Sequence, residues 1–149
     1  MTAAAAWHPL IDRGPIVEVT VGSHPSFLSK LLAMDIEPAS LRVPLLVDTG
    51  AKHTIIEQHV LDLLHLEAHA FIHLTTPGGA IPSCPTYHAE LKVHVGGGPV
   101  ILGTSVVGLA GRFEPNLAFK GLLGRSALKY VHFDYDGPGG LFKIWKPAR

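Results

Sequence analysis

An apolar run that ends in a carboxylate sets the first constraint on the fold. In the segment "PLLVDTGA", residues 44–51, Asp48 follows a strand-like apolar stretch and precedes Thr49 and Gly50. A buried, unpaired carboxylate is costly, so the chain must compensate for Asp48 or use it. An aspartate close to a glycine also caps ordinary turns. The motif alone therefore leaves a purely structural turn open as an alternative.

Short alternating apolar segments recur along the chain and predict a β-rich domain. Turns rich in glycine and proline separate them, including a hairpin tip at residues 77–82. We predict one all-β, barrel-like domain over residues 1–149, with two or three short helices. Strands are expected at residues 16–21, 41–48, 70–76, 86–95 and 100–110, and the sequence leaves open a break of the last one at Gly103. A further strand is expected at the start of residues 118–130. Residues 131–136 and 141–145 should form a closing hairpin.

Helical spacing appears in two of the connecting segments. The first segment begins at Pro25, which suits the first turn of a helix, and its spacing is carried by Phe27, Leu28, Leu31 and Leu32. The second is residues 55–66, where an amphipathic helix is expected from Ile56, Val60, Leu61 and Leu64. A further short helix is expected at the end of residues 118–130, after a tight turn.

The charge pattern excludes several classes of partner. Lys plus Arg and Asp plus Glu each number 12, so the formal net charge is zero, and no basic cluster suited to nucleic acid is present. The sequence has no polybasic run and no apolar stretch of about 20 residues, so we expect no membrane partner. The single Cys84 cannot form an internal disulfide, and the first residues do not resemble a signal peptide. We therefore expect a cytoplasmic protein.

Four segments, in this order, carry a family resemblance: "LLVDTGA", "TTPGGAIPS", "YHAELKVHV" and "GLLGRSAL". Together they resemble the retropepsin-like aspartic proteases, and the bacterial single-domain members more than the viral ones. The resemblance runs from about Ile16 to the C-terminus. It implies a closed barrel with pseudo-twofold halves, a flap hairpin and a functional homodimer. A weak internal echo agrees with the two halves, since "PLLVDTG" and "FKGLLGR" both run from an apolar pair into a glycine turn.

The resemblance also implies roles for individual residues. The catalytic positions would be Asp48, Thr49 and Gly50, with Thr49 bonding across the dimer and Gly50 allowing close backbone approach. Substrate would be bound by Ala51 and by the flap residues Pro77, Gly78, Gly79 and Ala80. The active loop would be supported by Leu122, Leu123, Gly124 and Arg125.

The number of aspartate motifs predicts the assembly. Peptide hydrolysis of this kind needs two carboxylates that share a proton across a water molecule. This chain has one Asp-Thr-Gly, so a dyad requires a homodimer with one Asp48 from each chain. The expected activity is that of an aspartic endopeptidase acting on peptides or proteins, without a cofactor. A catalytically silent dimeric peptide-binding module of the same fold is the alternative.

Three departures from the family pattern matter. Lys52 stands where viral members often carry an acidic residue, which removes the expected partner of Arg125. The flap lacks the tyrosine of pepsin-type enzymes. Ala51 replaces the serine usual in pepsins, so one hydrogen bond to the charged carboxylate is missing, and we expect an active window in mild rather than strong acid.

Two features of the sequence also occur in other classes of protein. A strand followed by Asp-x-Gly also occurs in actin-like and sugar-kinase-like ATPases, but those need two large lobes, which 149 residues cannot supply. The spacing of His65, His69 and His73 would suit a metal site on one continuous helix. That helix is expected to end near Leu66, so we predict scattered surface histidines and no metal.

Overall fold

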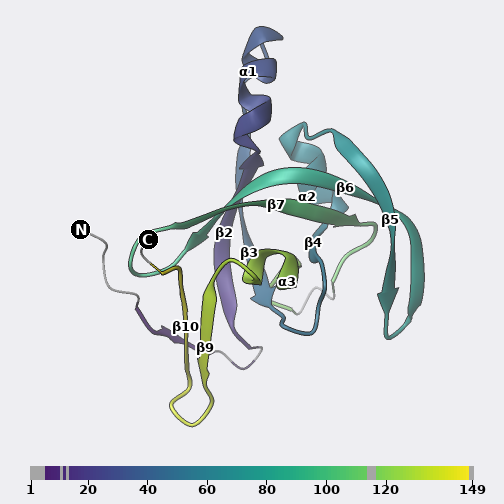
Figure 1. The fold of residues 1–149 in the computed structure, drawn as a ribbon. Helices are drawn as coiled ribbons and strands as arrows, with labels where there is room; N and C mark the ends of the chain where they lie inside the picture. Colours follow the sequence, from purple (N-terminus) through teal and green to yellow (C-terminus); the bar gives the residue numbers. More distant parts are fainter. Residues whose placement is uncertain (1–5, 11, 13, 114–116, 148–149) are drawn as a thin grey trace.

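The computed structural model describes residues 6–10, 12, 14–113 and 117–147 (Figure 1). Strands predominate in this part of the chain, and the all-β fold class expected from the sequence is confirmed. The helical segments are α1 (Pro25–Ala33), α2 (Gln58–Leu61), the 3₁₀ turn η1 (Asp62–Leu64) and α3 (Arg125–Leu128). The strands are β1 (His8–Pro9), β2 (Ile16–Ser23), β3 (Ser40–Val47), β4 (Thr54–Glu57), β5 (Ala68–Thr76), β6 (Gly79–His94), β7 (Val100–Leu109), β8 (Gly121–Leu123), β9 (His132–Asp136) and β10 (Leu141–Trp145).

Six of these strands close into a barrel. Around the ring the order is β2, β3, β8, β4, β7 and β6, and β6 then pairs with β2 again. The β3–β8 and β4–β7 contacts are parallel, and the other contacts around the ring are antiparallel. Closure removes the unpaired edges that an open sheet would leave.

The barrel interior follows from the period-two alternation of its strands. Along β2, Val17, Val19 and Val21 are buried, whereas Glu18 between them is exposed. The same alternation in β3 and β6 adds the buried residues Val43, Leu45, Val47, Ala89, Leu91 and Val93. Successive side chains of a strand point to opposite faces, so a barrel buries every second residue.

Strand β8 passes between β3 and β4. Leu122 lies opposite Leu46 in the parallel ladder with β3 and opposite Ile55 in the antiparallel ladder with β4. The two segments that echo each other in the sequence therefore pair side by side. Gly121 makes the close approach possible, because a Cβ there would overlap the Ile55 carbonyl oxygen and lie 2.8 Å from a methyl group of Leu45.

The expected helix over residues 55–66 is wrong in its first part. Thr54–Glu57 forms β4, which pairs with β7 and β8, and only Gln58–Leu61 is α-helical. Helical spacing was present, but two neighbouring strands offer the backbone of residues 54–57 ladder hydrogen bonds. Tertiary pairing thus overrides a local pattern that fits either structure. The suggested break at Gly103 is also absent, since β7 runs through it.

Helix α1 is inserted between β2 and β3 and projects from the barrel (Figure 1). Pro25 lies in its first turn, and the imidazole Nδ1 of His24 accepts a hydrogen bond from the Ser26 N–H at 3.2 Å. No residue of α1 is buried. None of the helices in the described ranges is long and apolar enough to cross a membrane.

A second, smaller sheet joins the two ends of the described chain. Strand β10 pairs with β1 on one side and with β9 on the other, as expected for the closing hairpin. Phe142 and Ile144 of β10 reach the barrel core. On the outside of the sheet, the Lys143 ammonium lies 4.7 Å from the centre of the Trp7 ring, in a cation–π arrangement.

The packing around β8 leads to a stability prediction. Gly121→Ala should lower the free energy of unfolding by about 1–3 kcal/mol, because the new methyl group must displace the backbone of β4. Gly22→Ala is the matched control, since a Cβ at Gly22 meets only ordinary contacts at 3.6 Å. Urea unfolding measures both variants. Equal stability of the two would contradict the close approach of β8 to β4.

Candidate active site

Asp48 follows β3 directly, where the parallel ladder with β8 ends. Its backbone N–H donates to the Leu123 carbonyl at 3.0 Å, so the loop begins from a fixed strand. The side chain is half-buried, and Oδ1 accepts a hydrogen bond from the Gly50 N–H at 2.9 Å. This bond compensates for part of the desolvation of the carboxylate. Among the described residues it is the one hydrogen bond that the Asp48 side chain receives.

The backbone of the Asp48 loop is joined to the segment after β8. The Arg125 N–H donates to the Ala51 carbonyl at 2.8 Å, and the Ser126 N–H donates to the Lys52 carbonyl at 3.1 Å. Gly124 permits this contact, because a Cβ there would overlap the His53 carbonyl. The expected supporting residues Leu122, Leu123, Gly124 and Arg125 thus lie beside the Asp48 loop.

Arg125 has a partner that sequence reasoning did not supply. Its guanidinium Nη1–H donates to the Thr49 carbonyl at 2.8 Å. The acidic partner missing at Lys52 is therefore replaced by a backbone oxygen of the Asp-Thr-Gly turn itself. Arg125 thus anchors the turn that carries the carboxylate, and Lys52 is exposed.

The hydroxyl groups of Thr54 and Ser126 form a hydrogen-bond network beside the loop, and the sequence did not predict it. Thr54 is fully buried, and its hydroxyl accepts hydrogen bonds from the Gly124 N–H at 3.2 Å and from the Ser126 hydroxyl at 2.9 Å. The Ser126 hydroxyl in turn accepts from the Thr54 N–H at 3.0 Å. Their only sequence signal is a hydroxyl residue beside an apolar run, which is too common to identify them.

The expected flap is the hairpin of β5 and β6. Its turn is Pro77–Gly78, and Gly79 has a positive φ of 120°, a region that favours glycine. The Thr76 hydroxyl donates to the Gly79 carbonyl at 2.8 Å and closes the turn. Pro77, Gly78, Gly79 and Ala80 are all exposed. In Figure 1 this hairpin bends away from the barrel, with its tip toward the end where β3 stops.

A small apolar cluster anchors this hairpin to β7. Leu74 and Cys84 pack with Val107 of β7, apart from the main core. No hydrogen bond or ion pair of the described residues links the flap tip to the Asp48 loop. The cluster also packs against Ile55 of β4, the strand that follows the Asp48 loop, so the hairpin and the loop are supported by neighbouring strands.

The histidines do not form the helical row that a metal site would need. His65 ends η1 in a left-handed conformation, while His69 and His73 lie on β5. No three His, Cys, Asp or Glu residues within the described ranges are close enough together to hold a metal ion. His69 instead stacks on His88 at 3.8 Å between ring centres. Beside the Asp48 loop, partial burial lowers the pKa of His53, and the charge of Lys52 lowers it further.

Comparison with known proteins finds a similarity of fold but none of sequence. No model of a protein family matches the sequence, and no curated protein matches it either. Among solved structures, the fold is similar to a retropepsin-like aspartic protease from Rickettsia conorii, with 16% sequence identity over 95% of this chain and 96% of that one, and a TM-score of 0.45. A likeness at this level does not establish a shared activity.

The hydroxyl network leads to a testable prediction. Thr54→Val keeps the size of the side chain but leaves the buried Gly124 N–H without its acceptor, which should lower the free energy of unfolding by about 1–3 kcal/mol. Thr75→Val is the matched control, because Thr75 is exposed on β5. Chemical denaturation compares the two variants. A stability loss no larger than that of Thr75→Val would show that the network does not hold the loop.

Proposed function

We propose that this chain is half of an aspartic endopeptidase, and that two chains complete the active site with one Asp48 each. The observation that carries the proposal is the Asp48 turn. A half-buried carboxylate is oriented by the Gly50 N–H, while Arg125 and the Gly124–Ser126 segment hold its loop. A group held in this way is pre-organised for chemistry rather than merely tolerated.

The composition of this site favours a shared dyad over a catalytic centre within one chain. The Asp48 loop and the β8–α3 segment provide only one carboxylate between them. The buried Glu57 is already engaged, because its two oxygens bind the His59 ring at 2.6 Å and the Phe113 N–H at 2.7 Å. A second acid therefore has to come from another molecule, and a twofold axis beside Asp48 supplies an identical one.

The reaction proceeds by direct attack of water on the peptide carbonyl. One Asp48 carboxylate, ionised, takes a proton from the water, while its protonated twin donates a hydrogen bond to the carbonyl oxygen. The resulting tetrahedral diol collapses as the peptide nitrogen accepts a proton, and the C–N bond breaks to give a carboxylic acid and an amine. In this proposal Ala51 and the flap residues 77–80 bind the peptide backbone, and the flap excludes water from the site.

Replacement of the carboxylate tests the proposal. Asp48→Asn keeps the shape of the side chain but removes the ionisable group, so cleavage of a peptide library should fall to the level of a blank. The dimer should stay folded. Asp35→Asn is the control, because Asp35 is exposed and lies just after α1. Cleavage by Asp48→Asn above the blank would exclude the aspartic mechanism. An inactive wild-type dimer that still binds peptide would favour the silent binding module.

Mixing the variant with the wild type separates a shared site from two independent sites. A tenfold molar excess of Asp48→Asn, allowed to exchange subunits, should reduce wild-type activity about tenfold, because most wild-type chains then lie in dimers with a single carboxylate. An excess of Asp35→Asn should cause no loss. Full activity of wild-type chains in the presence of Asp48→Asn would contradict the shared dyad.

The pH dependence of activity provides a third prediction for this site. A dyad with one ionised and one protonated member gives a bell-shaped profile. Ala51→Ser adds a hydroxyl that can donate to the ionised carboxylate, which stabilises the charged form. The acidic limb of the profile should therefore move to lower pH. Profiles of initial rate against pH for the wild type and Ala51→Ser measure the shift. Movement to higher pH would contradict this role of residue 51.

A further inference from the structure

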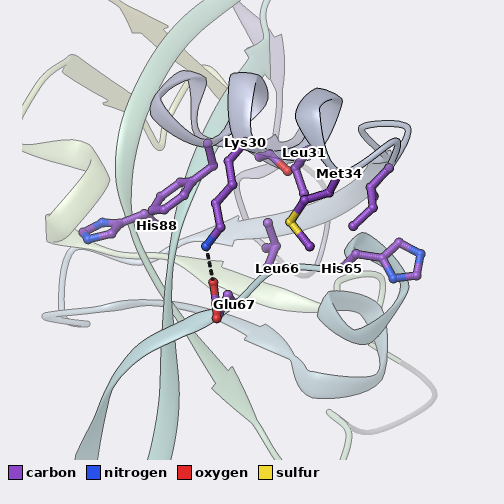
Figure 2. Close-up of a pocket in the computed structure, with 10 residues that line it drawn as sticks. Lys30, Leu31, Met34, His65, Leu66, Glu67 and His88 are labelled. Atoms are coloured by element: carbon purple, nitrogen blue, oxygen red, sulfur yellow. Dashed lines mark hydrogen bonds and ion pairs between the residues drawn. The ribbon is translucent and has the colours of Figure 1, made fainter.

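A cavity of about 220 Å³ lies beneath helix α1, between the helix, the segment that enters β5, and His88 of β6 (Figure 2). The β2–β3 register places it far from Asp48. Ser23 ends β2 on this side, where Gly22 pairs with Ser40, whereas Asp48 follows the other end of β3. The length of β3 separates the two sites by roughly 20 Å. The cavity is therefore distinct from the proposed active site.

The cavity wall is mainly apolar. It includes Phe27, Leu31, Met34, Ile36 and Leu66. Three of these residues belong to α1 or its C-terminal end, yet no residue of the helix is buried. A nine-residue helix is marginally stable by itself and normally gains stability by packing its apolar face. The apolar face of α1 borders a space that an apolar group could fill.

Ser23 adds a specific polar feature to this wall. The residue lines the cavity, is only 8% exposed, and its hydroxyl has no hydrogen-bond partner among the described residues. A buried hydroxyl without a partner is destabilising, and the next residue along the chain, His24, directs its ring toward Ser26 instead. The Ser23 hydroxyl is thus an unsatisfied donor in the cavity wall, and because its oxygen is covered, it meets an acceptor in the cavity only after the side chain rotates.

The cavity wall carries one permanent cation, Lys30, and one acidic residue, Glu67, which pair with each other. Lys30 lies 3.4 Å from Glu67, but their side chains are 58% and 80% exposed, so this ion pair contributes little and can be exchanged. Figure 2 shows the Lys30 side chain crossing the cavity toward Glu67. Desolvation lowers the pKa of His88, and the neighbouring His69 and His24 lower it further. Lys30 is therefore the permanent cation of the cavity, and it offers donors only.

We propose that the cavity binds a medium-chain alkyl carboxylic acid. The alkyl tail packs against Phe27, Leu31 and Leu66, and the carboxylate accepts hydrogen bonds from the Ser23 hydroxyl and the Lys30 ammonium in place of Glu67. The volume fits a tail of about six to eight carbons, since a cavity of about 150 Å³ holds one benzene molecule. Filling the cavity also packs the apolar face of α1.

Calorimetric titration with hexanoate, octanoate and octanol, below their aggregation concentrations, tests the proposal. Octanoate should bind more tightly than hexanoate by about three- to fourfold per added methylene group. Octanol, which lacks the charge, should bind several-fold more weakly than octanoate. Amide NMR shifts should change at Ser23, Leu31 and Leu66 and stay constant at Gly50.

Variants identify the two polar contacts. Ser23→Ala and Lys30→Met should each weaken octanoate binding several-fold. Lys92→Met is the matched control, because Lys92 is also an exposed lysine in an ion pair, at 3.9 Å to the half-buried Glu90, but does not line the cavity. Absence of saturable octanoate binding at millimolar concentration would overturn the proposal. So would equal affinity for octanol, unchanged affinity in both variants, or NMR shifts confined to residues outside the cavity. Binding is measured directly, so these outcomes do not depend on whether Asp48 is catalytic.

Discussion

The passage of β8 between β3 and β4 is the constraint on which the rest of the molecule depends. This three-residue strand pairs with β3 on one side and with β4 on the other, so it links the two segments that flank the Asp48 loop. Without it, the barrel ring would be open between β3 and β4. The glycine at position 121 is what allows three backbones to lie this close together.

The same crossing decides how the Asp48 carboxylate is presented. Its loop is held mostly by backbone hydrogen bonds, from Leu123 at its start to Ser126 near its end. Two side chains add to this support: Arg125 donates a hydrogen bond to the Thr49 carbonyl, and the Thr54 hydroxyl accepts one from the Gly124 N–H. A loop held by backbone ladders has little freedom to relax, so a charged group on it keeps its orientation.

The barrel therefore has two ends with different character. One end carries a tightly bonded loop with a single half-buried acid. The other carries α1, whose apolar face borders a cavity lined in part by Ser23, and the hydroxyl of Ser23 has no partner in the described part of the chain. Stability is concentrated in the ring of strands between them, which supplies most of the buried residues. Segments outside such a core are the usual places for binding and movement.

The sequence by itself determined the features that depend on neighbouring residues. Alternating segments predicted most of the strands, Pro25 marked the start of α1, and the glycine- and proline-rich segment 77–82 marked the hairpin tip. The position of Asp48 at the end of an apolar strand was also visible, as was the echo between "PLLVDTG" and "FKGLLGR". Each of these signals lies within a few residues of the feature it predicts, so local periodicity and turn chemistry are sufficient.

Only the tertiary structure decided the features that join distant segments. Residues 55–57 have helical spacing but form a strand, because β7 and β8 provide ladder partners. Arg125 binds the Thr49 carbonyl 76 positions away, and Thr54 meets Ser126 across 72 positions. The cavity beneath α1 likewise needs the helix, β2 and the entry to β5 to come together. Such contacts depend on how the barrel closes, and a local sequence pattern carries no information about which distant backbone groups closure brings within hydrogen-bonding distance.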